Sequence, residues 1–410
     1  MKINKKRIVK YCFAVGYLIF EFVELLKLFN PIVDTIIPDG LIGSIFIACF
    51  LIGFLLRIRD YNRYISTVFI IIFLAFTESA IIHGNTGIIT DIIKSNTSLI
   101  IFVMMLFYST ELDPENRIQE LRIISYLLIG INLIRLFTGG YYDENLNFSY
   151  MGFGYGTVVY WTIITRYAFL DKEIKDILIS LSVGLLMILF GNRGVILIEI
   201  TVIYLLIMYY WKLKNKILLA VSSIIFTIVI YIFFTNINLV FLNLAESFGL
   251  PSYTLERAIN KELLNDSGRN IIWEQVWHLL VQKPLSGYGI GYDRLYIGTH
   301  THNLVLEIML NFGILIGILF CIALTLIMFD LLRSNRSNQW RDLFLVYFIP
   351  STIMLMFSNS IYYSRDFWIA ISIYCAFKNS CRIKYKKKED TKHVVTIDNN
   401  MVRKEISDER

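Results

Sequence analysis

The segment PLSGYGIGYDRLYIGTHTHNLVLEIMLNFGILIG (284–317) holds the most informative part of the chain. Glycines and histidines come first, and an apolar run from Asn303 to about residue 330 follows. That run is long enough for a bilayer, which a helix of about 20 apolar residues crosses. Glycine lets a backbone approach a ligand, a helix N-terminus attracts anions, and imidazole transfers protons near neutral pH. The segment therefore predicts a membrane fold with polar chemistry at the membrane surface.

The composition of the whole chain agrees with a membrane fold. Of the 410 residues, 56% are hydrophobic and 18% are charged, which is too apolar for a soluble globular domain. The net charge of +6 does not indicate nucleic-acid binding, because the basic residues fall in short loops and a tail between apolar runs. No cysteine falls in a long polar loop, which argues against a disulfide framework. The basic N-terminus precedes a long apolar run without a small-residue cleavage site, so we expect an uncleaved first span.

Apolar runs of membrane length recur along the chain and predict an all-α polytopic membrane protein with about twelve transmembrane helices. Their approximate limits are 9–29, 38–56, 64–83, 92–109, 121–138, 150–170, 174–190, 194–211, 216–235, 303–330, 342–358 and 361–378. The runs divide the chain into a membrane domain over 1–235, a large loop over 236–302, a second membrane domain over 303–378, and a basic, then polar tail over 379–410.

Lysine and arginine gather on one side of the predicted membrane. Most of them lie in the N-terminal segment and in the short loops of the same side, whereas the short loops of the opposite side hold only Lys94, Arg135, Arg193 and Arg365. Positive charge stays on the cytoplasmic side. Both termini are therefore predicted to be cytoplasmic, and the loop over 236–302 extracytoplasmic.

The large loop carries a helix signal of its own. The run over 269–283 follows Ser267 and Gly268 and ends before Pro284, and these residues frame a helix of about 14 residues. Trp273 and Trp277 lie beside its apolar face. An amphipathic helix with two tryptophans is typical of the membrane interface.

Cationic side chains stand where predicted helices begin on the outer side. Arg193 opens one such helix, Arg365 opens another, and His302 and Asn303 open a third. Because a helix N-terminus carries partial positive charge, each position favours an anion. Arg269 adds a guanidinium from the loop, and guanidinium groups match phosphate oxygens bidentately. For any one arginine, a side chain that extends to the membrane surface is the alternative interpretation.

The histidines and glycines have alternative interpretations too. His300 and His302 are close enough to suggest a metal site, but no cysteine and no third ligand at a recognisable spacing support zinc. Gly287, Gly289 and Gly291 resemble a dinucleotide fingerprint, but the strand–turn–helix context that this motif needs is absent. We therefore expect neither a metal nor a nucleotide cofactor.

A set of short motifs adds a family resemblance. His302-Asn303 is followed by nine residues, Gly313, three residues and Gly317. Upstream are Gly268-Arg269, Trp273, the run PLSGYG (284–289) and GNRG (191–194). In this order and on this side of the membrane, the motifs resemble the O-antigen ligase and Wzy-type polymerase family of bacterial envelope enzymes, over roughly residues 187–320. The stretch FSYMGFGYG (148–156) stands where that family has an Asn-rich element.

The resemblance implies a GT-C-like enzyme of the bacterial plasma (inner) membrane, acting on its outer side. Its donor would be a polyprenyl-diphosphate-linked oligosaccharide, its acceptor a glycan, and a chain-length regulator and a flippase its partners. Arg193 and Arg269 would stabilise the leaving diphosphate, and His302 would act as general base or position the hydroxyl or phosphate. Direct attack would invert the anomeric carbon without a metal. The expected substrate-binding residues are Asn303, Gly287, Gly289, His300 and Arg365.

Two further functions stay open at this point. A ligase would move the finished glycan to a different acceptor, and the Ile-, Asn- and Lys-rich composition only inclines the prediction toward a polymerase. A flippase for the lipid-linked oligosaccharide would need polar groups near the middle of the membrane, for which Glu21, Glu24, Glu78 and Glu199 are candidates. The long outer loop with its arginines and histidines favours an enzyme.

Overall fold

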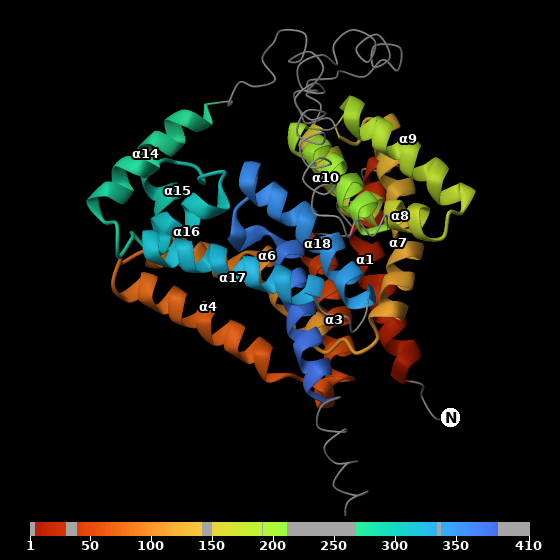
Figure 1. The fold of residues 1–410 in the computed structure, drawn as a ribbon, viewed down its shortest axis with the longest axis horizontal. Helices are drawn as coiled ribbons and strands as arrows, with labels where there is room; N and C mark the ends of the chain where they lie inside the picture. Colours follow the sequence, from red (N-terminus) through yellow and green to blue (C-terminus); the bar gives the residue numbers. More distant parts are fainter. Residues whose placement is uncertain are drawn as a thin grey trace, which may run out of the picture.

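The computed structural model describes residues 5–29, 39–141, 150–190, 192–210, 268–333 and 338–383. Within these ranges the regular secondary structure is entirely helical, which confirms the all-α prediction (Figure 1). The elements are α1 (Lys5–Phe29), α3 (Asp39–Leu55), η1 (Ile58–Asp60), α4 (Arg63–Ile81), α5 (Thr86–Lys94), α6 (Asn96–Ser109), α7 (Pro114–Phe137), α8 (Tyr150–Leu170), α9 (Ile174–Phe190), α10 (Arg193–Tyr210), α14 (Arg269–Gln282), α15 (Tyr292–Tyr296), α16 (Leu304–Phe312), α17 (Ile314–Arg333), α18 (Asn338–Phe357), η2 (Ile361–Tyr363) and a last helix over 365–383.

Membrane-length apolar helices are present in the described ranges. Three helices are long and apolar enough to cross a bilayer: Arg63–Ile81, Ile314–Leu331 and Gln339–Phe357. The α5–α6 pair is a fourth if its 62° bend belongs to one broken span. The predicted span over 216–235 and most of the tail over 379–410 lie outside the described residues. The total of twelve spans and the GT-C-like arrangement stay predictions.

The single span predicted over 303–330 is corrected, because the chain breaks at Gly313 into α16 and α17. Gly313 has a φ of 88°, and a Cβ atom there would lie 2.2 Å from the carbonyl oxygen of Leu285. The N–H of Ile314 donates to the carbonyl of Pro284 at 2.8 Å. The glycine-rich segment therefore occupies the place that a continuous helix would need, and the apolar span begins only at Ile314.

The span predicted over 92–109 is also corrected. Ser95 is extended, with φ −63° and ψ 135°, and its side chain accepts a hydrogen bond from the N–H of Ser98 at 3.3 Å. Serine in this conformation is a helix N-cap. It ends α5 and starts α6 in a new direction.

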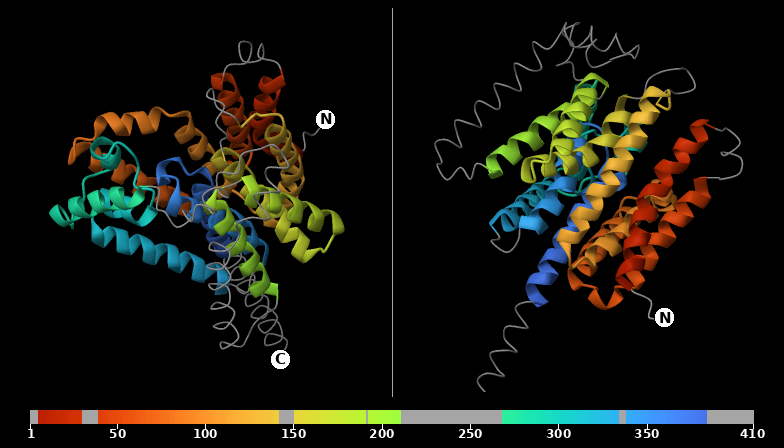
Figure 2. Two further views of the ribbon diagram at one scale, coloured as in Figure 1. Left: turned by 90° about the horizontal axis from the view of Figure 1, so that it is seen from above. Right: turned by 90° about the vertical axis from the view of Figure 1, so that its right-hand side faces the viewer.

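An aromatic core joins the N-terminal helices. Phe13 of α1, Phe50 of α3 and Phe107 of α6 are fully buried and pack ring against ring. A Cβ atom at Gly16 would lie 2.5 Å from the Phe50 ring, so the glycine lets α1 and α3 approach closely. The core continues into α7, α8, α10 and α18, and these helices form the body of the molecule (Figure 1, Figure 2).

A second, smaller assembly lies to one side of this body (Figure 1). Val276, Leu279 and Leu280 of α14 are buried together with Leu306 and Leu310 of α16. A helix is thus present, as α14, at the place expected over 269–283, and it packs on α16. The helices α14, α15 and α16 carry most of the chemistry-bearing residues.

Candidate functional site

Two histidine rings pack together just before α16. The ring centroids of His300 and His302 lie 3.9 Å apart. Nε2 of His300 lies 3.1 Å from the carbonyl oxygen of Ser358, and since a carbonyl only accepts, His300 carries its proton on Nε2. His302 has a left-handed backbone with φ 52°, and its Nδ1 is buried without a hydrogen-bond partner among the described residues. One imidazole is therefore held in place, and the other has a buried ring nitrogen without a hydrogen-bond partner in the described part of the chain.

Neighbouring residues hold the histidine segment from three sides. The N–H of Thr301 donates to the buried carboxylate of Asp293 at 3.3 Å, and the Trp273 indole N–H donates to the carbonyl of Thr301 at 3.0 Å. The side-chain oxygen of Asn303 accepts from the N–H groups of Val305 and Leu306 at 3.0 and 3.1 Å. Asn303 is thus the N-cap of α16, and its oxygen is committed to the helix.

Positive charge surrounds the histidine pair. Burial, followed by electrostatic interactions with His300 and Arg269, lowers the pKa of His302 to about 4. Burial also lowers the pKa of His300, with smaller contributions from Arg294 and Arg269. Both imidazoles are therefore neutral at pH 7. Arg269 is the half-buried first residue of α14, and its charge lowers the pKa of both rings. Its part in an anion site stays a prediction.

Arg294 is a guanidinium that the sequence analysis missed. Its Nη2 donates to the Ser360 hydroxyl at 2.9 Å, and its guanidinium carbon lies 4.9 Å from the centre of the Tyr363 ring. Its Nη1 is buried without a hydrogen-bond partner in the described part of the chain. Ser360 donates in turn to the buried carboxylate of Glu307, which also accepts from the N–H of Ile361 at 3.1 Å. Arg294 is thus rigidly held, with one donor group uncommitted.

Ser358 connects the histidine pair to α8 and α10. The hydroxyls of Tyr155 and Ser358 are 2.5 Å apart, while the carbonyl of Ser358 lies next to His300. A Cβ atom at Gly194 would lie 2.6 Å from the Tyr155 hydroxyl. The start of α10, which is Arg193, therefore lies near the same group of residues, although the Arg193 side chain lies outside the described part. Tyr155 belongs to the stretch over 148–156, whose sequence carried no recognisable site signal.

The glycines of the 284–291 segment approach other parts of the protein. The N–H groups of Tyr288 and Gly289 donate to the carbonyls of Leu310 and Asn311, both at 2.8 Å. A Cβ atom at Gly287 would lie 2.6 Å from the carbonyl oxygen of Asn311. These glycines close the end of α16, where helix carbonyls lack partners. That Gly287 and Gly289 also contact a substrate stays a prediction.

A turn between α4 and α5 supports this segment from the other side. The Asn85 side chain donates to the carbonyls of Tyr288 and Ile290 at 2.9 and 3.2 Å, and the N–H of Ile290 donates to the Ser79 hydroxyl at 2.8 Å. Both polar side chains are buried. They link parts of the chain about two hundred residues apart, and no sequence spacing indicated this contact.

Arg365 interacts with Asp366 and with two tyrosines of the core. It begins the last helix, and its Nε is 3.1 Å from the carboxylate of Asp366. Its other electrostatic neighbours include Tyr160 and Tyr17, which belong to the core. No group of three or more His, Cys, Asp or Glu side chains within the described ranges is placed to hold a metal ion. The geometry brings together Arg269, Arg294, His300, His302 and the start of α10. That Arg365 contacts a substrate stays a prediction.

The fold and the site together define an all-helical membrane protein with a cationic, histidine-containing site at converging helix ends. Residues 177–321 match the family model described as O-Antigen ligase, which confirms the resemblance predicted from the motifs. The matched region covers less than half of the chain, and it includes Arg193, Arg269 and His302. No curated protein and no solved structure matches the chain. The match indicates a function of the O-antigen ligase and polymerase type in polysaccharide assembly, with lipid-linked glycans as substrates.

Proposed function

We propose that the protein is an extracytoplasmic glycosyltransferase that polymerises polyprenyl-diphosphate-linked repeat units into capsule, exopolysaccharide or O-antigen. The observation that carries the proposal is the neutral His302, with its uncommitted Nδ1, in the field of Arg269 and next to His300. An acceptor hydroxyl must lose a proton while a diphosphate leaves with negative charge. A neutral imidazole among guanidinium groups serves both needs.

The reaction proceeds by direct displacement. The acceptor oxygen attacks the anomeric carbon, the bond from that carbon to the diphosphate oxygen breaks, and the hydroxyl proton passes to Nδ1 of His302. Arg193, Arg269 and Arg294 stabilise the departing diphosphate, and the anomeric carbon inverts. A pKa of about 4 makes His302 a weak base in the free protein. The negative charge of a bound donor raises that pKa, so His302 becomes a stronger base once the donor is bound.

Some of the carboxylates that a flippase would need have partners within the protein. Glu21 pairs with Arg135 at 3.0 Å, and Glu78 lies 2.9 Å from Nε2 of His83. Two of the four candidate membrane carboxylates thus have partners, and this favours the enzyme. A ligase would use the same cationic groups with a different acceptor, so the product of the reaction distinguishes it from a polymerase.

The test is transfer by the purified protein in liposomes, with a synthetic polyprenyl-diphosphate-linked repeat unit as the only glycan. We expect a ladder of lipid-linked products, which mass spectrometry resolves. Arg193→Ala, Arg269→Ala and Arg294→Ala should each lower the rate by about 100-fold or more, because each removes a donor that stabilises developing charge. Lysine should restore only part of the rate, since it offers a point charge instead of a planar fork.

Arg59→Ala is the matched control, because Arg59 is exposed and far in sequence from the site residues. It should transfer at the rate of the unchanged protein. Full activity in one of the three alanine variants at the site would remove that arginine from the mechanism. Transfer only to an added lipid A or peptidoglycan-type acceptor would identify a ligase. Loss of activity in a chelator, restored by a divalent ion, would contradict the metal-free mechanism.

A further inference from the structure

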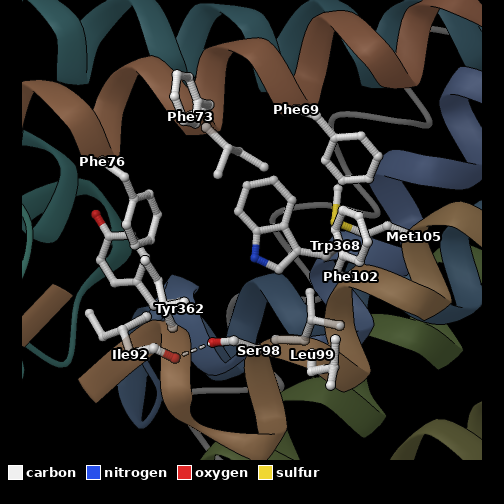
Figure 3. A pocket seen from close by; sticks show the side chains of 13 residues that line it. Phe69, Phe73, Phe76, Ile92, Ser98, Leu99, Phe102, Met105, Tyr362 and Trp368 are labelled. Atoms are coloured by element: carbon white, nitrogen blue, oxygen red, sulfur yellow. Dashed lines mark hydrogen bonds between the residues drawn. The ribbon is translucent and has the colours of Figure 1, made fainter. Parts of the chain in front are cut away.

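An apolar cavity of about 500 Å³ lies between α4, the bent α5–α6 pair and the start of the last helix (Figure 3). Its volume falls in the range of small-molecule sites, about 300–1,000 Å³. The lining is strongly aromatic and consists of Phe69, Ile72, Phe73, Phe76, Ile92, Ile93, Ser98, Leu99, Ile101, Phe102, Met105, Tyr362 and Trp368.

The polar groups of the lining are already satisfied. The Ser98 hydroxyl donates to the carbonyl of Ile92 at 2.6 Å, and the Trp368 indole N–H donates to the carbonyl of Ile361 at 2.8 Å. Figure 3 shows Phe69 and Phe76 pointing from α4 toward the opposite wall, with the Trp368 ring between the two walls. The cavity therefore offers rings and aliphatic groups but no free hydrogen-bonding partner, and its occupant must be apolar.

One wall of the cavity is open toward the membrane. Phe73, Leu99 and Phe102 line the cavity and are yet 69%, 47% and 46% exposed. The helix that carries Phe73 is one of the candidate membrane spans, and only 11% of that span is buried inside the protein. A hydrocarbon chain can thus enter sideways from the bilayer without crossing a polar surface.

The other end of the cavity reaches the cationic site through η2. The Tyr362 ring packs edge-on against Phe76, with centroids 6.0 Å apart, and its hydroxyl accepts from the Asn311 side chain at 2.8 Å. Two residues earlier, the Ser360 hydroxyl accepts from Arg294, whose Nη1 has no partner in the described part. Tyr362, which lines the cavity, is therefore two residues from Ser360, which accepts a hydrogen bond from Arg294. The apolar cavity and the guanidinium N–H without a partner in the described part both lie next to η2.

We propose that this cavity binds the isoprenoid chain of the lipid-linked donor, with Arg294 contacting the diphosphate at the end of that chain. The proposal rests on the proposed function for the identity of the lipid. Charge complementarity selects the occupant: a single molecule with a long hydrocarbon chain directly attached to a multiply charged anion matches an apolar cavity that ends at a guanidinium group. The cavity thereby sets which bond of the donor lies near His302.

Photocrosslinking tests the occupant without any transfer reaction. A benzophenone side chain replaces Phe73 in the full-length protein, and replaces Leu74 in the control, which is 59% exposed on the same helix but does not line the cavity. The probe is a glycan-free polyprenyl diphosphate of membrane-spanning length in phosphatidylglycerol liposomes. We expect crosslinking from position 73 at least ~10-fold above that from position 74, and loss of most of it in Arg294→Ala.

Competition experiments then identify the ligand. Excess unlabelled polyprenyl diphosphate should abolish the crosslink, whereas inorganic diphosphate and excess phosphatidylglycerol should leave it intact. Equal displacement by phosphatidylglycerol would mean an ordinary lipid groove, and a protein–protein adduct would mean that a second copy covers the cavity. Either result overturns the proposal. Equal crosslinking from positions 73 and 74 does so as well.

Kinetics separate this proposal from the proposed function. Phe73→Ala should raise the KM for a long-chain donor about tenfold and leave the KM for a donor with two isoprene units unchanged, while Leu74→Ala changes neither. An equal effect on both donors would contradict chain binding. Specific crosslinking without any glycan transfer would support the lipid-binding role of the cavity and contradict the glycosyltransferase proposal. Transfer without specific crosslinking would support the glycosyltransferase and overturn the assignment of the cavity.

Discussion

His302 differs from an ordinary surface histidine in two properties. Its backbone is left-handed, a conformation that non-glycine residues rarely adopt, and its pKa is lowered to about 4 by burial, His300 and Arg269. The Asp293–Thr301 and Trp273–Thr301 hydrogen bonds hold the preceding residue and keep the ring against His300. The residue is therefore positioned and neutral before any substrate binds.

We expect His302→Ala to stop transfer while the donor still binds, because the arginines are unchanged. His302→Gln should fail too, since an amide takes no proton at neutral pH, whereas His300→Ala should be milder.

A base works only when unprotonated, so activity is lost as pH falls through its pKa. With a pKa of about 4, kcat/KM should stay level down to about pH 5. Normal transfer by His302→Gln would leave His302 a positioning role, and an acid limb near pH 6.5 would contradict the lowered pKa.

At the scale of secondary-structure elements, the break between α16 and α17 builds the site. Gly313 and Gly287 both have positive φ, and both lie against backbone atoms of the other's segment. The break ends α16 at Gly313 and lets the glycine-rich segment donate hydrogen bonds to the last carbonyls of that helix. A continuous helix over 303–330 would remove both features.

We expect Gly313→Ala to destabilise the protein by about 3 kcal/mol or more, because it adds a clash with the Leu285 carbonyl to the cost of a left-handed alanine. Gly298→Ala is the matched control, because Gly298 has a φ of 81° but nothing within 4 Å of an added Cβ atom. It should cost only about 1 kcal/mol. Thermal unfolding in detergent measures both. Equal effects of the two substitutions would mean that close packing at Gly313 is unimportant.

At the scale of the whole molecule, buried and half-buried ion pairs connect the helices of the body. Arg117 contacts Glu111, Arg122 contacts Asp176, and Nε of Arg166 donates to Asp342 at 3.1 Å. These pairs join α7 to the end of α6, α7 to α9, and α8 to α18. All three arginines belong to the side predicted to be cytoplasmic. The first residues of α1 and the end of the last helix both lie at the lower edge of Figure 1 and of the right-hand view of Figure 2.

We expect both termini to be cytoplasmic and the loop over 236–302 extracytoplasmic, on the asymmetry of lysine and arginine. Single cysteines at Ser252 and Ser334, both outside the described residues, test this in a variant without other cysteines. A membrane-impermeant reagent should label position 252 in intact cells and position 334 only after lysis. The reverse pattern would invert the topology and place the histidine pair on the wrong side for a lipid-linked donor.

Features that depend on neighbouring residues could be predicted from the sequence alone. Helix caps and apolar periodicity placed a helix over 269–283 where α14 lies, and composition predicted an all-α membrane protein. The motifs around Arg193, Arg269 and His302 predicted the family that the O-antigen ligase match supports. These signals are local, because a cap, an apolar stripe or a short motif needs only a few adjacent residues.

Features that depend on distant contacts required the tertiary structure. Hydrophobic length cannot reveal a break at Gly313, because that break depends on the carbonyl of Leu285. Arg294 joins the site because it contacts Ser360 and Tyr363. Tyr155 joins it because its hydroxyl contacts the hydroxyl of Ser358. The aromatic cavity forms where α4, α6 and the last helix meet. The sequence by itself therefore determined the class of fold and the resemblance to the family. Packing between distant segments decided which polar groups stay without a partner in the described part and where the apolar cavity lies.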